Sequence, residues 1–210
     1  TNATSTNTGD IAIDSITGNS NALTLSTENN VTQTDIEIVG AVTGITTLTL
    51  QNVGGTATLS GDVDVTTLTV GNTVANVAFT GNGSSVANSF TPDNDGTFIF
   101  GASGGTQTYN GGLNTASVDG TVTLNGTIAS SNDAIGFDVV TLGSNTTIDT
   151  NATSSTGNIS IGGGSGVITG GNNTLTLTTE NNVADADVQI DATISGVTTL
   201  TIANVGGFTR

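Results

Sequence analysis

The feature that most constrains the fold of this chain is the recurrence of short segments in which apolar and polar residues alternate. Examples are IAI at 11–13, LTL at 23–25, IEI at 36–38 and LTL at 48–50, with clusters of Gly, Asn, Asp and Ser between them. Period-two alternation predicts strands, and the clusters predict turns. The strand segments recur about every 22 residues, a spacing typical of a solenoid coil. We therefore expect an all-β fold, a single parallel β-solenoid of about nine or ten coils that runs as one continuous domain over residues 1–210.

A long internal repeat supports this expectation. The segment Asn29–Gly55 returns as Asn181–Gly207, and roughly half of the aligned positions are identical. The similarity also includes the start of the chain. We therefore expect residues 1–149 to form one repeat and residues 150–210 to form a partial second copy.

The differences between the two copies predict which side chains are buried. Ile36 becomes Val188, which conserves an aliphatic side chain, whereas Glu37 becomes Gln189 and Val39 becomes Asp191. Successive residues of a strand point to opposite faces, so we expect Glu37 and Val39 to point outward. The residues expected to point inward are Ile36, Ile38, Leu48, Leu50, Val188, Ile190, Leu200 and Ile202.

The composition excludes most chemistry. The chain has 17 Asp and Glu residues but a single Lys or Arg, no His and no Cys, and its net charge is −16. Without His or Cys, neither a Ser-His-Asp triad nor a zinc site of the usual ligands can form. With almost no basic residues, the chain cannot neutralise phosphates. No apolar run has the length of a membrane span. We therefore expect no enzymatic activity, no nucleic-acid partner and no membrane insertion.

Paired carboxylates are the candidate metal ligands. Acidic residues at i and i+2 share one face of a strand, and calcium prefers such oxygen ligands. The segment DNDG at 93–96 is the best candidate, because Asp93 and Asp95 precede a Gly that turns the chain; the pair Asp62 and Asp64 is a weaker one. The alternative interpretation is a solvated β-turn. Calcium is the one cofactor that we consider, and the two further acidic pairs of this spacing are Asp35/Glu37 and Asp185/Asp187.

Aromatic residues concentrate in the part of the chain that occurs only once. We expect residues 79–110 to form an irregular or widened coil. Phe98, Phe100 and Tyr109 lie in this stretch and are the candidate residues for binding a glycan or a host surface. The alternative interpretation is that the rings fill the interior of a wide coil.

Several motifs resemble a known family. GGTQTYNGGL (104–113), TVTLNGTI (121–128) and VVTLGSNTTIDT (139–150) resemble the repeats of filamentous-haemagglutinin-like and autotransporter-type bacterial surface proteins. The resemblance implies a right-handed β-helix passenger region, export to the bacterial cell surface, and an adhesive or stalk role. It implies no catalytic residues.

Two functions remain open at this point. One is an extracellular structural rod within a long surface fibre, and the other is an adhesin that presents residues 79–110 to a glycan or host surface. Both termini fall inside a repeat, so we expect either end-to-end self-association or covalent continuation in a longer repeat protein. The single basic residue, Arg210, is the last one, as cleavage by a trypsin-like protease would leave it.

Overall fold

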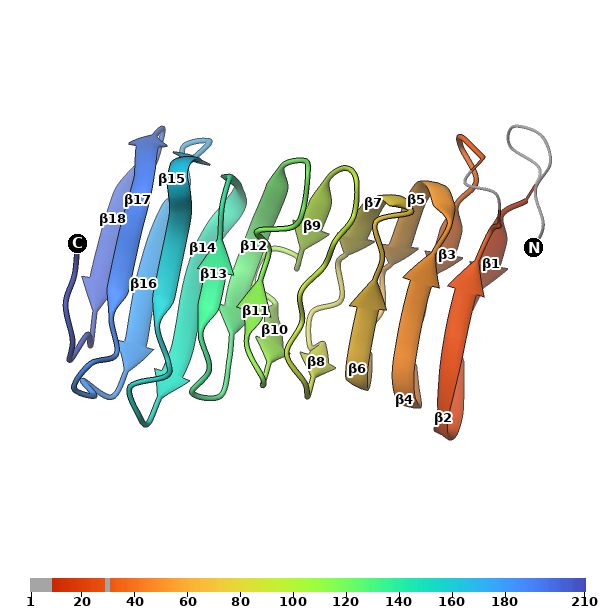
Figure 1. Cartoon of the computed structure of the whole chain (residues 1–210), viewed down its shortest axis with the longest axis horizontal. Coiled ribbons are helices and arrows are strands. Elements are labelled where there is room, and N and C mark those ends of the chain that lie inside the picture. The colour runs from red at the N-terminus through yellow and green to blue at the C-terminus, as the bar shows by residue number, and fades with distance from the viewer. Residues whose placement is uncertain (1–8, 29–30) are drawn as a thin grey trace.

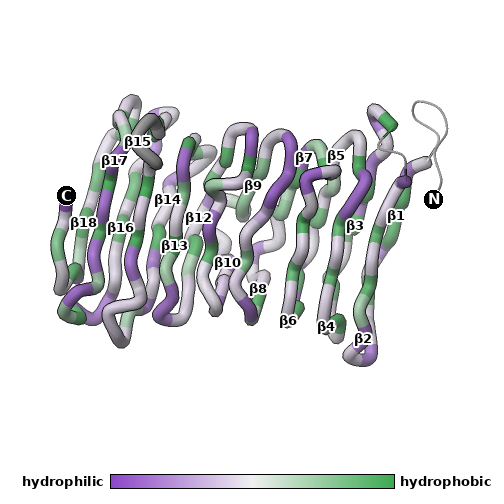
Figure 2. Tube along the Cα trace, viewed as in Figure 1, coloured by the Kyte–Doolittle hydropathy of each residue, from purple (hydrophilic) through white to green (hydrophobic). Residues whose placement is uncertain are grey.

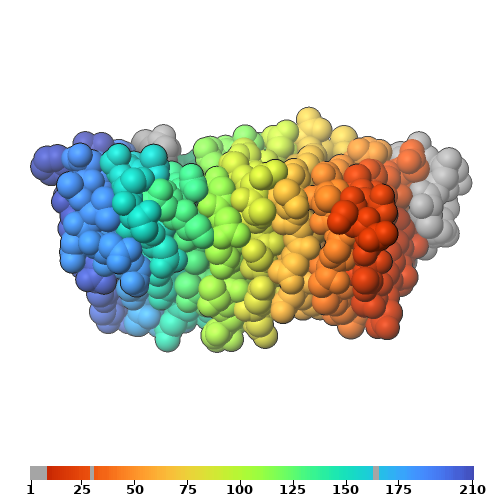
Figure 3. All heavy atoms as spheres, turned by 90° about the horizontal axis from the view of Figure 1, so that it is seen from below, coloured from red at the N-terminus to blue at the C-terminus, as the bar shows by residue number. Residues whose placement is uncertain are grey.

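The chain forms a rod of stacked coils, with its first and last described strands at opposite ends of the rod (Figure 1). The structure is a computed structural model that describes residues 9–28 and 31–210, without the side chains of residues 163–165. The first eight residues of the expected repeat, together with Asn29 and Asn30, lie outside this range. Seen in space-filling form, the coils follow one another in chain order along the rod (Figure 3).

All regular structure in the described residues is β-strand, and the strands belong to one sheet in which every recorded pairing is parallel. No helix of the length and apolarity needed to cross a membrane occurs among these residues. The strands are β1 (Ile11–Ile13), β2 (Ile16–Ser26), β3 (Ile36–Ile38), β4 (Val42–Gln51), β5 (Val53–Leu59), β6 (Val63–Val70), β7 (Val74–Phe79), β8 (Ser85–Val86), β9 (Phe98–Phe100), β10 (Thr106–Tyr109), β11 (Leu113–Asn114), β12 (Val122–Ala129), β13 (Ile135–Phe137), β14 (Val140–Ala152), β15 (Ile159–Thr169), β16 (Thr174–Glu180), β17 (Val188–Ser195) and β18 (Thr199–Ala203).

The strand registers define rows of stacked residues that run along the rod. One row contains Ile11, Ile36, Ala57, Val77, Phe98, Val122, Val140, Ile168 and Ile194. Each step along this row is one coil, so the solenoid has about eight turns with a spacing of roughly 24 residues. The solenoid prediction is therefore confirmed, although the coils are fewer and longer than the expected nine or ten of about 22 residues. At roughly 4.8 Å per coil, the stacked coils span about 38 Å.

Burial follows the period-two pattern in the first copy of the repeat. Ile36, Ile38 and Leu48 are fully buried, whereas Glu37 is exposed and Val39 is 56% exposed. Apolar residues recur along the strands and hydrophilic residues gather at the turns (Figure 2). The inward and outward predictions for this copy are confirmed, and the aliphatic rungs form one continuous core.

The same pattern is less fully buried in the second copy. Val188 is buried, but Ile190 and Ile202 are only partly buried and Leu200 is 39% exposed. Leu200 pairs with the buried Leu175, so it points inward as predicted, and its exposure comes from the open side of its coil. Its strand, β18, pairs with β16 on one side, and among the described residues no further coil covers the other side.

The corners of the coils have the same backbone conformation in both copies. Gly44 and its counterpart Gly196 have φ angles of 66° and 67°, and Asn52 and its counterpart Asn204 have φ angles of 53° and 54°. These angles lie in the left-handed region, which Gly and Asn occupy at little cost. The sequence repeat is therefore also a repeat of local structure.

One repeat of the sequence does not equal a whole number of turns. Val42 pairs with Val63, and both residues lie in a different row from Ile36. Ile194, the counterpart of Val42, nevertheless lies in the row of Ile36. Equivalent residues of the two copies consequently lie on different faces of the rod.

Candidate functional site

The DNDG segment forms a corner between two coils. Asn94 is fully buried, and its Nδ2 donates hydrogen bonds to the carbonyl oxygens of Gly96 and Thr97 at 3.0 and 3.1 Å. Asp93 and Asp95, on either side of Asn94, are exposed. The structure therefore brings the two carboxylates to the outer surface, where both the calcium prediction and the solvated-turn interpretation remain open.

Asp62 and Asp64 are used differently from each other. Oδ1 of Asp62 accepts a hydrogen bond from the backbone N–H of Gly83 at 2.7 Å, whereas Asp64 is exposed. Among the residues that the structure describes, no three Asp or Glu side chains converge in a group that could hold a metal ion. Any calcium ion at these pairs would therefore need carbonyl oxygens or water for its remaining ligands.

The candidate aromatic residues lie in the interior. Phe98 and Phe100 are 0% exposed and Tyr109 is 1% exposed. The Phe98 and Phe100 rings are stacked with centroids 4.1 Å apart, and Phe90 stacks on Tyr109 at 5.7 Å. The structure thus places these rings in the core of the middle coils, where a glycan cannot reach them. The reason is that the strands between residues 79 and 110 are short and the large rings fill the space that aliphatic rungs fill elsewhere.

Tyr109 is held by a buried polar group that the sequence did not reveal. Its hydroxyl donates to Oε1 of Gln107 at 3.0 Å, and Nε2 of Gln107 donates to the carbonyl oxygens of Phe79 and Gly81 at 3.0 and 3.2 Å. Burial raises the pKa of Tyr109 well above its ordinary value. The phenol therefore stays protonated, and this network joins neighbouring coils from within.

Many Asp and Asn side chains bond the backbone of the next coil. In both copies, Oδ1 of the residue just before a strand accepts the N–H of the equivalent position one coil later. The bonds are Asp35 N–H to Asp10 (3.0 Å), Thr56 N–H to Asp35 (2.7 Å), Asp187 N–H to Asn158 (2.7 Å) and Phe208 N–H to Asp187 (2.7 Å). Asp10 and Asn158 are counterparts, so the amide serves as well as the carboxylate. Three of the acidic side chains, Asp10, Asp35 and Asp187, therefore help to join neighbouring coils.

One carboxyl pair between neighbouring coils was not predicted. Partial burial raises the pKa of Asp149, and the nearby Glu180 raises it further through charge repulsion and a side-chain hydrogen bond. A hydrogen bond from the Asn151 N–H to Oδ1 of Asp149 opposes this effect. The two acids are 31 positions apart in the sequence, so no local spacing could have identified them. The Asp149 carboxyl therefore holds a proton more readily than an isolated carboxylate.

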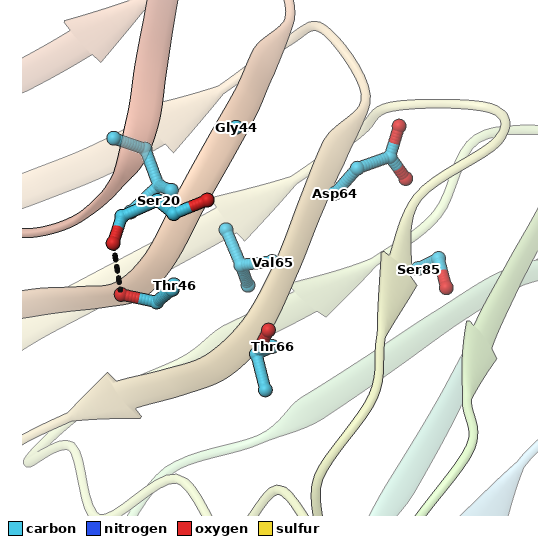
Figure 4. Close-up of a pocket in the computed structure, with 8 residues that line it drawn as sticks. Ser20, Gly44, Thr46, Asp64, Val65, Thr66 and Ser85 are labelled. Carbon is cyan, nitrogen blue, oxygen red and sulfur yellow. Dashed lines mark hydrogen bonds between the residues drawn. The ribbon is translucent and has the colours of Figure 1, made fainter.

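A shallow groove lies on the outer surface of β2, β4, β6 and β8. Its lining includes Ser20, Gly44, Thr46, Asp64 and Ser85, and Figure 4 shows Asp64 and Ser85 on one side, away from Ser20 and Thr46. A side chain at Gly44 would meet the backbone of Gly18, so the two neighbouring strands approach each other closely here. The groove offers hydroxyl groups and one carboxylate, a set suited to weak polar contacts.

Several aliphatic side chains are partly exposed at the C-terminal end of the rod. We use the term C-terminal end surface for Ile194, Val197, Leu200, Ile202 and Val205. Ile194 and Leu200 are each 39% exposed, and the other three are partly buried. Ile194 lies on β17, and Leu200 and Ile202 lie on β18. Both strands pair with earlier coils on one side, and residues 208–210 bond only the first half of β17 on the other side.

Comparisons of the chain with protein-family models, with curated proteins and with solved structures gave no match. The fold is compatible with a repetitive β-helix protein.

Proposed function

We propose that this chain is a non-catalytic structural protein, a β-solenoid rod that forms part of a long fibre on a bacterial surface. The proposal rests on one observation, the continuous stack of parallel coils whose aliphatic rungs form one core along the rod. In such a fold each coil is stabilised by the coils stacked on it, so a longer stack is a more stable rod. The motif resemblance to filamentous-haemagglutinin-like and autotransporter-type proteins agrees with a stalk role at the cell surface.

End-to-end joining is a head-to-tail contact, because the surface on one end differs from the surface on the other. Contacts of this kind build filaments unless the rotation between units closes a ring. Exposed edges of this kind are usually protected by Lys or Pro, and the chain has no Lys and a single Pro, Pro92. The net charge of −16 opposes association at low ionic strength, and salt screens this repulsion.

Electron microscopy and sedimentation of the purified 210-residue chain test the proposal. We expect single rods in dilute, low-salt solution, and filaments of the same width at high protein concentration and about 0.15 M salt. Chains that remain monomeric rods under these conditions would favour covalent continuation of the repeat over self-association. Compact particles without a rod shape would contradict the proposal as a whole.

The adhesin alternative gains no specific support. Its aromatic residues, Phe98, Phe100 and Tyr109, are buried, so residues 79–110 present mainly Thr, Asn, Asp and Gly to solvent. We therefore propose the structural role alone.

A further inference from the structure

One sheet face of the rod carries a row of threonines that the sequence spacing hides. The strands β10, β12, β14, β16 and β18 follow one another along the rod (Figure 1), and their register stacks one Thr of each strand on the next. We use the term threonine row for Thr106, Thr127, Thr147, Thr176 and Thr201. The intervals along the chain are 21, 20, 29 and 25 residues, so the structure aligns side chains that are unequally spaced in the sequence.

The threonine row lies on the outer surface, and its hydroxyl groups are open to an external partner. Thr106 and Thr201 are exposed and the three members between them are half-buried, whereas the next residues along the strands, such as Ile128, are buried. Inward threonines such as Thr150 use Oγ1 to bond a backbone carbonyl. Among the described residues, no hydrogen bond uses the Oγ1 atom of any member of the threonine row.

The surroundings of the threonine row carry little charge. Thr174 and Thr199, two positions before Thr176 and Thr201, pair with each other on one side of it. The parallel row on the other side contains Thr108, Ala129, Asp149, Thr178 and Ala203. One carboxylate therefore lies beside the row in a chain whose net charge is −16. Such a surface suits an uncharged partner that both donates and accepts hydrogen bonds.

The geometry of the row selects a partner with a regular lattice. Neighbouring coils lie about 4.8 Å apart, and positions i and i+2 of a strand lie about 6.6 Å apart. Thr is β-branched and stiff at χ1, so hydroxyl and methyl groups repeat at these distances in fixed orientations. Strand propensity explains why Thr occupies outward positions one at a time. It does not require Thr to stack on Thr through five consecutive coils of unequal length.

We propose that the threonine row, together with Thr174 and Thr199, binds the surface of an ice crystal. Ice is uncharged, its water molecules both donate and accept hydrogen bonds, and its oxygen atoms repeat along one axis at a distance close to the spacing of the coils. The hydroxyl groups would take the places of water molecules in that lattice, and the methyl groups would favour ordered water between them. A rigid array loses little conformational freedom on binding. The row runs along the side of the rod, so this function does not depend on fibre formation.

Ice-affinity partitioning of the 210-residue chain tests the proposal. Ice is grown slowly from a dilute solution, and the protein concentrations in the ice and in the remaining liquid are compared. We expect the chain to be enriched in the ice relative to a non-binding protein of similar size. Thr127→Tyr and Thr147→Tyr should each reduce this enrichment at least about fivefold, because a protruding ring holds the neighbouring threonines out of contact.

The same two strands supply matched controls on another face of the rod. Thr123 of β12 and Thr141 of β14 pair with each other and are half-buried, like Thr127 and Thr147. They lie beyond the register shift at Leu124, in the row of Ile99 of β9. Thr123→Tyr and Thr141→Tyr should therefore leave the enrichment within about twofold. Far-UV circular dichroism and melting curves establish that all four variants are folded.

Three results would overturn the proposal. The first is exclusion of the unsubstituted chain from ice, and the second is enrichment that Thr127→Tyr and Thr147→Tyr do not reduce. The third is an equal loss in the control variants, which would mean that the threonine row is not the surface that binds. Retention on crystalline cellulose or chitin by a chain that ice excludes, lost in Thr147→Tyr, would identify a crystalline polysaccharide as the partner instead.

Discussion

Leu48 and Leu200 allow a direct measurement of what a covering coil contributes to stability. They are the same residue at equivalent positions of the two copies, but Leu48 is 0% exposed and Leu200 is 39% exposed. Leu48 lies between Leu23 and Leu68 of the adjacent coils. Leu200 lies against Leu175 on one side and faces no other described coil. We predict that Leu48→Ala costs clearly more stability than Leu200→Ala.

The expected magnitudes follow from burial. Leu48→Ala leaves a closed cavity, for which the loss of unfolding free energy is about 3 to 5 kcal/mol. Leu200→Ala opens to solvent, so only the transfer of about three carbon groups is lost, at about 0.8 kcal/mol each when fully buried. Scaling that value for an exposure of 39% gives roughly 1.5 kcal/mol. The two losses should therefore differ by about 1.5 to 3.5 kcal/mol.

Urea unfolding followed by far-UV circular dichroism, at low micromolar protein, measures both losses. Thr24→Ala and Thr201→Ala are matched controls at outward positions and should each change stability by less than about 1 kcal/mol. The comparison should then be repeated at a concentration at which chains associate. A bound coil stabilises the folded state by mass action, so the cost of Leu200→Ala should rise there. Equal costs of the two Leu substitutions in dilute, monomeric protein would refute the reasoning.

Three further predictions address the polar groups. The raised pKa of Asp149 means that the folded state favours the protonated form. The contribution of this group to stability is therefore lost as pH rises from the ordinary carboxyl range through the raised value. In melting curves from pH 3 to 8, Asp149→Asn should raise stability at pH 7 and flatten its pH dependence more than the exposed control Asp64→Asn does. If calcium binds at the DNDG corner, chelator at constant ionic strength should lower the melting temperature, and Asp93→Asn should remove that sensitivity. A melting temperature that chelator does not change would favour the interpretation of this corner as a solvated turn. Tyr109→Phe removes the hydroxyl that donates to Oε1 of Gln107, and it should lower the free energy of unfolding in urea by about 1 to 3 kcal/mol. No change would mean that water or a rearranged amide supplies the missing hydrogen bond to Gln107.

The period-two pattern was sufficient to predict strands, the parallel solenoid and the direction of side chains. It correctly placed Ile36 and Ile38 inside and Glu37 and Val39 outside. It overestimated the number of coils, because polar residues can be added at a corner without changing the apolar rungs. The step from Val140 to Ile168 is 28 residues, whereas the step from Ala57 to Val77 is 20. Coil length is thus weakly encoded in the pattern that reveals the strands.

The sequence was a poorer guide to the sites, because they depend on which residues of neighbouring coils meet. An alternating pattern says that Leu200 faces the interior, but not whether another coil covers it. Aromatic residues near Gly and Asn fit an exposed platform as well as a core, and only stacking placed Phe98 and Phe100 inside. Asp149 and Glu180 come together through a strand register between residues 31 positions apart. In each case the missing information is non-local.

The offset between the repeat and the turn has a consequence for any fibre built from such units. Ile194, the counterpart of Val42, stacks in the row of Ile36. One sequence repeat therefore differs from a whole number of turns by the step from one face of the coil to the next. Glu37 and Gln189, equivalent outward residues, therefore face different sides of the rod. A fibre that kept this offset would turn each surface to a different side from one unit to the next. A partner that recognised one face would then find its sites on more than one side of the fibre. Display on more than one side would suit the proposed stalk role, and it would follow from the non-integral repeat rather than from any single residue.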